Sequence, residues 1–252
     1  MNQTEAWLQI RAWRKLKRVE LIACRMALPD AQRRELGIAI SACIESGFAL
    51  LAGMTIGFCW PYKGEFDARF VIRKFRTRGA HAALPAVMTK AGPLEFRKWW
   101  PGAPMTRGVY DIPVPDGTEL VVPDAAIVPM NGFDEQGYRL GYGGGYFDRT
   151  LAACTPRPLA IGVSFELARL PTIHPQPHDI AMDFIVTEAG LHAVADSRLV
   201  RVGANECLER ARHLCEARGL PRRSPPHPTG YSSPPCYAAE FPGYFGESDQ
   251  KS

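Results

Sequence analysis

The strongest structural signal in the chain is residues 125–154, AAIVPMNGFDEQGYRLGYGGGYFDRTLAAC. The stretch begins with an apolar run typical of a buried strand, passes through a glycine-rich turn, and ends in a short helical pattern from Gly145 to Cys154. A glycine-rich turn between a strand and a helix is an arrangement that binds phosphate in α/β proteins. The stretch therefore indicates an α/β fold and a candidate ligand site.

Strand and helix patterns alternate on both sides of this stretch. We expect helices over 5–27, 30–46, 67–78 and 205–218, and strands over 54–60, 82–88, 120–130, 159–163 and 182–186. Such alternation predicts an α/β fold with a single open mixed or parallel sheet flanked by helices. We expect this domain to span residues 1–200, and a helix plus a flexible Pro/Ser/Gly-rich tail to span 201–252.

Composition excludes several classes of protein. The 252 residues are 46% apolar and 22% charged, which excludes collagen, a coiled-coil rod and wholesale disorder. A net charge of +4 does not by itself favour nucleic acid or a membrane surface. The apolar stretch 36–60 carries Glu45, which is costly in a bilayer, so a helix end followed by a strand explains it better than a membrane span. Seven scattered cysteines without a CxxC pair favour reduced thiols in the cytoplasm.

The glycine-rich turn lacks the usual phosphate-binding spacings. It matches neither GxxxxGK[ST] nor GxGxxG, and no lysine closes it. Phosphate charge would then be neutralised by Arg139 and Arg149 beside the turn, or by cations from elsewhere. The first helix is one source, because Arg14 and Arg18 lie one turn apart on the same face. A tight turn without a ligand and a solvated basic face are the alternative interpretations.

Carboxylates and an aromatic side chain add to the candidate site. Asp148 directly follows the turn, where it could bind Mg²⁺ that bridges phosphates or could simply stabilise a helix N-terminus. Trp60 and Glu65 follow the strand over 54–60, so they could provide a wall and a hydrogen-bond acceptor for a flat heterocycle. Asp179 is a candidate second carboxylate. The pair His174 and His178 does not predict zinc, because neighbouring prolines preclude a regular helix.

Several ordered motifs resemble those of the 5-formyltetrahydrofolate cyclo-ligase (5,10-methenyltetrahydrofolate synthetase) family. The resemblance covers about Trp13 to Glu188 and rests on Lys63-Gly-Glu65-x-Asp67, Gly132-Phe-Asp134, the stretch from Arg139 to Arg149, and His178-Asp179-Ile-x-x-Asp183. It implies a fold similar to the sugar-phosphate isomerase and CoA-transferase group. It also implies ATP- and Mg²⁺-dependent closure of 5-formyltetrahydrofolate to 5,10-methenyltetrahydrofolate, through a phosphorylated formyl group, with release of ADP and phosphate.

The resemblance also implies roles for individual residues. It assigns ATP binding to Arg14, Arg18, Arg139, Leu140, Gly141, Tyr142, Gly143, Gly144, Gly145, Tyr146 and Phe147. It assigns folate contacts to Trp60 and Glu65, Mg²⁺ to Asp148 and Asp179, and catalysis to Arg139, Tyr142 and Asp148. We expect 5-formyltetrahydrofolate and ATP as partners, a monomer, and neither a membrane nor nucleic acid.

Two departures from the family pattern concern the phosphate charge. Arg14 stands where lysine is expected, and Gly144 occupies a position that is lysine in some members, so the turn here relies more on remote cations. A catalytically silent relative that binds nucleotide or folate, as a regulatory or RNA-associated module, is the alternative function.

Overall fold

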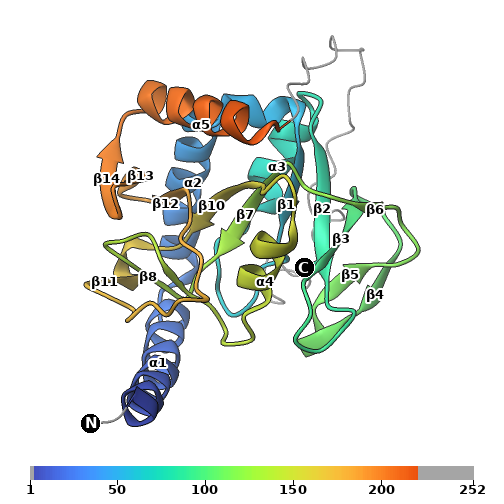
Figure 1. Ribbon diagram of the computed structural model, residues 1–252. Coiled ribbons are helices and arrows are strands. Elements are labelled where there is room, and N and C mark those ends of the chain that lie inside the picture. Colours follow the sequence, from blue (N-terminus) through green and yellow to red (C-terminus); the bar gives the residue numbers. More distant parts are fainter. Residues whose placement is uncertain (1–2, 221–252) are drawn as a thin grey trace.

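The computed structural model describes residues 3–220. Helices cover its main sheet (Figure 1), which has nine strands. The strand order is β14-β13-β12-β10-β7-β1-β2-β3-β6. The strands from β12 to β2 run parallel, and antiparallel strands extend both edges of the sheet. The predicted α/β fold with a mixed sheet flanked by helices is confirmed. Two small additional sheets, β11-β8-β9 and β4-β5, were not predicted.

The elements have the following bounds. The helices are α1 (Gln3–Met26), α2 (Asp30–Gly47), α3 (Arg69–Arg76), α4 (Tyr146–Ala153) and α5 (Ala204–Arg218), with 3₁₀ helices η1 (Ala49–Gly53), η2 (Val109–Asp111) and η3 (Glu166–Ala168). The strands are β1 (Thr55–Phe58), β2 (His81–Ala86), β3 (Glu95–Trp99), β4 (Met105–Arg107), β5 (Pro113–Pro115), β6 (Leu120–Val121), β7 (Ala125–Pro129), β8 (Gly132–Asp134), β9 (Arg139–Leu140), β10 (Leu159–Val163), β11 (Arg169–Leu170), β12 (Phe184–Thr187), β13 (Gly190–Ala195) and β14 (Arg198–Val202).

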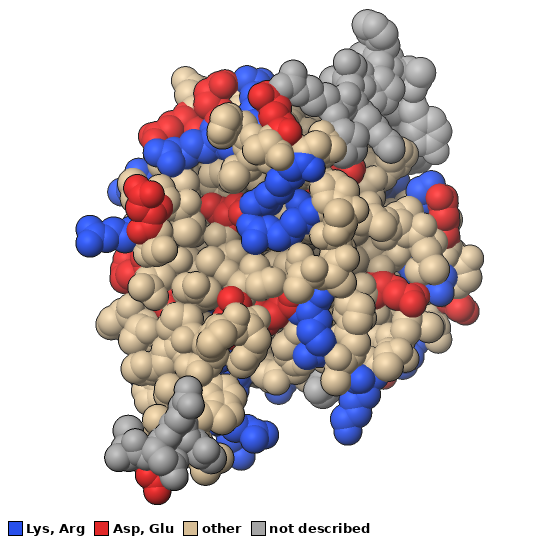
Figure 2. Space-filling model, viewed as in Figure 1, with Lys and Arg blue, Asp and Glu red and all other residues tan. Residues whose placement is uncertain are grey.

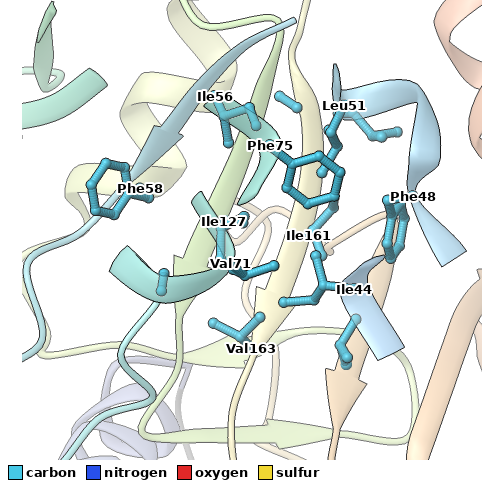
Figure 3. Close-up of a cluster of buried hydrophobic side chains, with 14 of the residues drawn as sticks. Ile44, Phe48, Leu51, Ile56, Phe58, Val71, Phe75, Ile127, Ile161 and Val163 are labelled. Carbon is cyan, nitrogen blue, oxygen red and sulfur yellow. The ribbon is translucent and has the colours of Figure 1, made fainter. Parts of the chain in front are cut away.

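Both faces of the central strands are buried. Ile127 and Ile161 belong to the larger core, which also contains Ile44 of α2 and Phe75 of α3 (Figure 3). The alternate residues Ala126, Val128, Ala160 and Ile185 belong to a second core together with Leu151 of α4. Two-sided burial explains why β7 and β10 read as continuous apolar runs and were predictable, since parallel strands covered on both faces have no polar side.

The apolar stretch 36–60 consists of the end of α2, then η1 and β1, as expected. Among the described residues, no helix has the length and apolar character needed to cross a membrane. The predicted domain boundary at residue 200 falls inside β14, and α5 packs against α2 with Cys207 and Cys215 buried in the larger core. The predicted flexible tail beyond Leu220 lies outside the described residues.

Candidate active site

A cavity of about 630 Å³ opens at the carboxyl ends of neighbouring parallel strands. Its lining includes Cys59 and Trp60 after β1, Val87 after β2, and Pro129 at the end of β7. In open α/β sheets this edge is where ligands bind, because the loops leave the sheet there and the N-termini of the following helices offer free backbone N–H groups. The volume is sufficient for a small-molecule ligand and is within the usual range for such sites.

The glycine-rich turn forms one side of this cavity. It connects β9 to α4, and all five residues from Gly141 to Gly145 line the cavity. Gly143 and Gly145 have φ values of 94° and 63°, a left-handed conformation in which any other L-residue is strained. A Cβ at Gly144 would lie 2.7 Å from the ring of Tyr146. The sequence therefore needs glycine in this turn for conformation and for space.

Cations from α1 reach the turn. The Arg18 Nε–H donates to the Gly141 carbonyl at 2.7 Å, and a Cβ at Gly143 would lie 3.3 Å from the Arg18 guanidinium. Burial and the neighbouring charge of Arg14 lower the pKa of Arg18, which indicates a confined positive charge. On the other side of the turn, the Arg149 guanidinium donates to the Gly144 carbonyl at 2.6 Å. The structure thus brings two guanidinium groups onto a turn that lacks lysine.

Arg14 is committed to a carboxylate. Its guanidinium donates to Asp179 Oδ2 at 2.6 Å, to the Ile173 carbonyl at 2.9 Å and to the His174 carbonyl at 2.9 Å. Burial of Asp179 favours its neutral form, but hydrogen bonds from Arg14 and the Gln176 N–H outweigh burial and lower the pKa of Asp179. The pair Arg14–Asp179 therefore fixes the segment around 173–179 against α1 at the edge of the cavity.

Arg139 and Asp148 form a second buried ion pair. The two terminal nitrogens of Arg139 donate to the two oxygens of Asp148 at 2.9 and 3.0 Å. Asp148 Oδ1 also accepts the Ile180 N–H at 3.1 Å. The exposed fractions of the two side chains are 5% for Arg139 and 15% for Asp148. The pair clamps β9 to the first turn of α4, across the glycine-rich turn.

The carboxylates of Asp148 and Asp179 suit Mg²⁺ only as part of a larger ligand set. Among the described residues there is no group of three side chains able to hold a metal ion. In each carboxylate one oxygen accepts a single hydrogen bond from the described residues: Asp148 Oδ2 accepts from Arg139, and Asp179 Oδ1 accepts from Arg14. Mg²⁺ normally takes one or two protein carboxylates and completes its shell with phosphate oxygens and water. The donor set therefore fits a metal ion that arrives with a phosphate ligand.

The predicted wall and acceptor, Trp60 and Glu65, lie in the connection between β1 and α3 and also line the cavity. Trp60 is fixed between the Arg69 guanidinium, 4.4 Å from its ring centroid, and the edge of Trp99, at 6.4 Å. Glu65 is buried, accepts the Tyr142 hydroxyl at 2.8 Å on Oε1, and accepts the Tyr62 N–H at 3.1 Å on Oε2. Burial raises the pKa of Glu65, and Arg25 and the two hydrogen bonds oppose that rise.

Sequence reasoning missed residues that line the cavity and one residue, Arg25, that holds its lining from behind. Arg25 is buried and donates to the Tyr142 hydroxyl at 3.1 Å and to the Lys63 carbonyl at 2.9 Å. Trp7 and His178, which line the cavity, meet edge to face with 6.1 Å between their ring centroids. Trp7, Arg14 and Arg18 lie at spacings close to whole helical turns, and Arg25 continues that face of α1. This spacing could have identified the face of α1 that is turned to the site.

The surface charges in one view do not form a basic stripe. Figure 2 shows Lys and Arg interspersed with Asp and Glu over this face. A nucleic-acid-binding surface usually clusters its cations along a face or a helix. This face therefore gives no support to the RNA-associated alternative.

Comparisons with known proteins agree on one family. The model of the 5-formyltetrahydrofolate cyclo-ligase family matches residues 10–188. The chain is 30% identical over 180 residues to a 5-formyltetrahydrofolate cyclo-ligase of Mycolicibacterium smegmatis, covering 68% of this chain and 91% of that protein. It is 30% identical over 133 residues to a 5-formyltetrahydrofolate cyclo-ligase of Escherichia coli, covering 50% of this chain and 73% of that protein. Among solved structures, 5,10-methenyltetrahydrofolate synthetase of Aquifex aeolicus matches with a TM-score of 0.64 and 25% identity over 75% of this chain and 96% of that one.

Proposed function

Since the chain belongs to the 5-formyltetrahydrofolate cyclo-ligase family, we propose that its cavity holds ATP and 5-formyltetrahydrofolate together. The reaction is the ATP-dependent closure of 5-formyltetrahydrofolate to 5,10-methenyltetrahydrofolate, with release of ADP and phosphate, and the enzyme is a ligase of folate-dependent one-carbon metabolism. One observation carries the assignment to this cavity. The arginine-supported glycine-rich turn and the pair Trp60 and Glu65 line the same space of about 630 Å³.

We assign the nucleotide to the side of the cavity formed by the turn. The backbone of the turn binds the triphosphate, and Arg18 and Arg149, already bonded to the carbonyls of Gly141 and Gly144, bring positive charge beside it. Arg139, held by Asp148, acts from the base of the turn, together with Leu140, Tyr146 and Phe147, which line the same side. Arg14 contributes through Asp179, which it fixes at the rim of the cavity.

We assign the folate ring to Trp60 and Glu65. The indole offers a flat apolar wall, and the carboxyl oxygens of Glu65 accept ring N–H donors. In the reaction the formyl oxygen attacks the γ-phosphorus and the bond to ADP breaks, which converts the formyl group into an iminium phosphate. The folate N10 then attacks the former formyl carbon, the carbon–oxygen bond breaks, phosphate leaves, and N10 loses its proton. Such a transfer depends mainly on positioning and on neutralising phosphate charge, which are the tasks of the residues above.

Mg²⁺ would be held by Asp148 and Asp179 together with phosphate oxygens, and its role when bound is to neutralise charge on the transferred phosphoryl group. The two ion pairs hold these carboxylates at the cavity. We further propose a sheet of the sugar-phosphate isomerase and CoA-transferase type, a monomer, and a cytoplasmic location. The scattered cysteines without a CxxC pair support that location.

The test is a direct assay of ring closure. The purified chain is mixed with 5-formyltetrahydrofolate and Mg·ATP, and near-ultraviolet absorbance, which the methenyl product has and the substrate lacks, is followed. We expect an absorbance rise that requires ATP. A chain that binds both ligands without any such rise would be the catalytically silent relative, and the proposed reaction would be wrong.

A further inference from the structure

Tyr142 belongs to the glycine-rich turn, but its hydroxyl group bonds to the folate side of the cavity. The hydroxyl donates to Glu65 Oε1 at 2.8 Å, and Glu65 is 77 residues away in the connection between β1 and α3. The ring of Tyr142 also meets the ring of Tyr62, with centroids 5.8 Å apart. One side chain therefore joins the segment assigned to the nucleotide and the segment assigned to folate.

Arg25 fixes this junction from a third segment. Its Nη2 donates to the Tyr142 hydroxyl oxygen at 3.1 Å, and its Nε donates to the Lys63 carbonyl at 2.9 Å. Arg25 is buried at 4% exposure, whereas Tyr142 is 43% exposed. A buried guanidinium thus orients a hydroxyl on a side chain that the surface turn would otherwise leave free to rotate.

The junction leaves Glu65 able to bind a ligand. An ionised carboxylate has about four acceptor positions. The Tyr142 hydroxyl occupies one on Oε1 and the Tyr62 N–H occupies one on Oε2, so each oxygen keeps one position for an added donor. Two adjacent N–H donors of a heterocycle match this pair of positions. A folate ring can therefore bind Glu65 while Tyr142 stays in place.

One conformation of the turn makes both contacts. Arg18 holds the Gly141 carbonyl while the next residue, Tyr142, reaches Glu65. A ligand that orders the turn also orders the acceptor, and a ligand on Glu65 also orders the turn. By linkage, each ligand then raises the affinity for the other by the same factor.

We propose that Tyr142, oriented by Arg25, is a positioning residue that couples binding of the nucleotide to binding of the folate. This inference rests on the proposed function, since it takes the two ligands from it. A hydrogen bond to a charged group sets the size of the effect, which we expect to be about tenfold in affinity. Tyr142→Phe removes only the hydroxyl group and keeps the ring against Tyr62.

The experiment measures the affinity for 5-formyltetrahydrofolate by titration calorimetry, with and without a saturating non-hydrolysable ATP analogue and Mg²⁺. We expect the analogue to raise folate affinity about tenfold in the unmodified protein and less than about twofold in Tyr142→Phe. Tyr138→Phe is the matched control, because Tyr138 is in the same segment but does not line the cavity. It should keep the full coupling.

The outcomes separate this inference from the proposed function. If the unmodified protein forms no methenyl product, the proposed function fails. If it forms product but the analogue does not change folate affinity, or Tyr142→Phe keeps the coupling of the unmodified protein, the coupling role of Tyr142 is refuted while the function stands. A merely structural role would lower the unfolding midpoint of Tyr142→Phe and leave the ratio of the two affinities unchanged.

Discussion

Replacing Asp148 by asparagine separates its role as partner of Arg139 from its proposed role at Mg²⁺. The carboxylate accepts two hydrogen bonds from Arg139, at 2.9 and 3.0 Å, and the exposed fractions of the two side chains are only 15% and 5%. Removing one member of a buried ion pair leaves an uncompensated charge and costs about 3–5 kcal/mol. Asparagine keeps the shape and one acceptor oxygen, so we expect the lower end of that range, about 3 kcal/mol.

The loss should appear in the protein without metal or nucleotide. For a chain of this size, a loss of about 3 kcal/mol lowers the unfolding midpoint by roughly 6–12 °C, which calorimetry or circular dichroism resolves easily. Turnover measured against Mg²⁺ concentration reports the second role. If Asp148 also binds the metal, Asp148→Asn requires more Mg²⁺ for half-maximal turnover, beyond any loss of maximal rate.

Asp67→Asn is the matched control for this measurement. Asp67 makes a two-pronged pair with Arg69 at 2.8 and 2.7 Å, and the exposed fractions of the two side chains are 14% and 5%. Neither residue lines the cavity. We expect a similar loss of stability and an unchanged Mg²⁺ requirement. A metal-free Asp148→Asn protein that unfolds at the same temperature as the unmodified protein would refute the argument that this pair clamps the turn.

Three further predictions test the turn and the folate acceptor. Arg18→Gln should weaken nucleotide binding about tenfold in an equilibrium titration, because it removes a confined positive charge beside the turn. Lys17→Gln on the same helix should leave nucleotide binding unchanged, because Lys17 pairs with Glu20 on the surface and does not line the cavity. Gly145→Ala should lower the free energy of unfolding by roughly 1–2 kcal/mol because φ is 63°, and Gly141→Ala, which meets open space, by less than about 1 kcal/mol. The pKa of Glu65 is raised in the folded protein, so the unmodified protein loses stability as pH rises and Glu65 ionises. Glu65→Gln does not ionise, so its unfolding free energy relative to the unmodified protein should increase from about pH 4 to neutral pH. A difference that does not vary with pH would contradict the raised pKa.

The parallel centre of the fold and the position of the glycine-rich turn between a strand and a helix were predictable from local patterns. The apolar runs at 125–128 and 159–163 have no polar face, which is the property of strands covered on both sides, and both were found in β7 and β10. Of the four glycines in the turn, Gly143 and Gly145 have the left-handed backbone conformation that favours glycine. The strand expected over 120–130 was wrong as one element, because it divides into the edge strand β6 and the central strand β7. The outer strands β3, β13 and β14 were missed for the opposite reason. β14 reads Arg-Leu-Val-Arg-Val, is mostly exposed, and is defined by pairing with β13 rather than by its own pattern.

The side-chain partners in the site could not be predicted in the same way. Arg25 meets Tyr142 across 117 residues, and Tyr142 meets Glu65 across 77 residues. Nothing in the local sequence of either segment encodes such a contact, because it depends on how α1 and the β1–α3 connection pack together. Asp148 was correctly placed beside the turn, but its partnership with Arg139 requires the reversal of the chain between β9 and α4.

The dependence of the nucleotide site on α1 follows from these contacts. Few buried apolar contacts hold α1 at the site. In the part of the chain that the structure describes, Leu21 of α1 belongs to a small cluster whose other buried members are Leu140 and Ile173. Arg14, Arg18 and Arg25 add hydrogen bonds from α1 to the rest of the protein. These bonds end on backbone carbonyls or on groups that line the cavity. A lysine inside the turn would supply charge whether or not the first helix was docked. A turn that takes its charge from α1 gains it only when α1 is in place, so binding of phosphate and docking of this helix must stabilise each other.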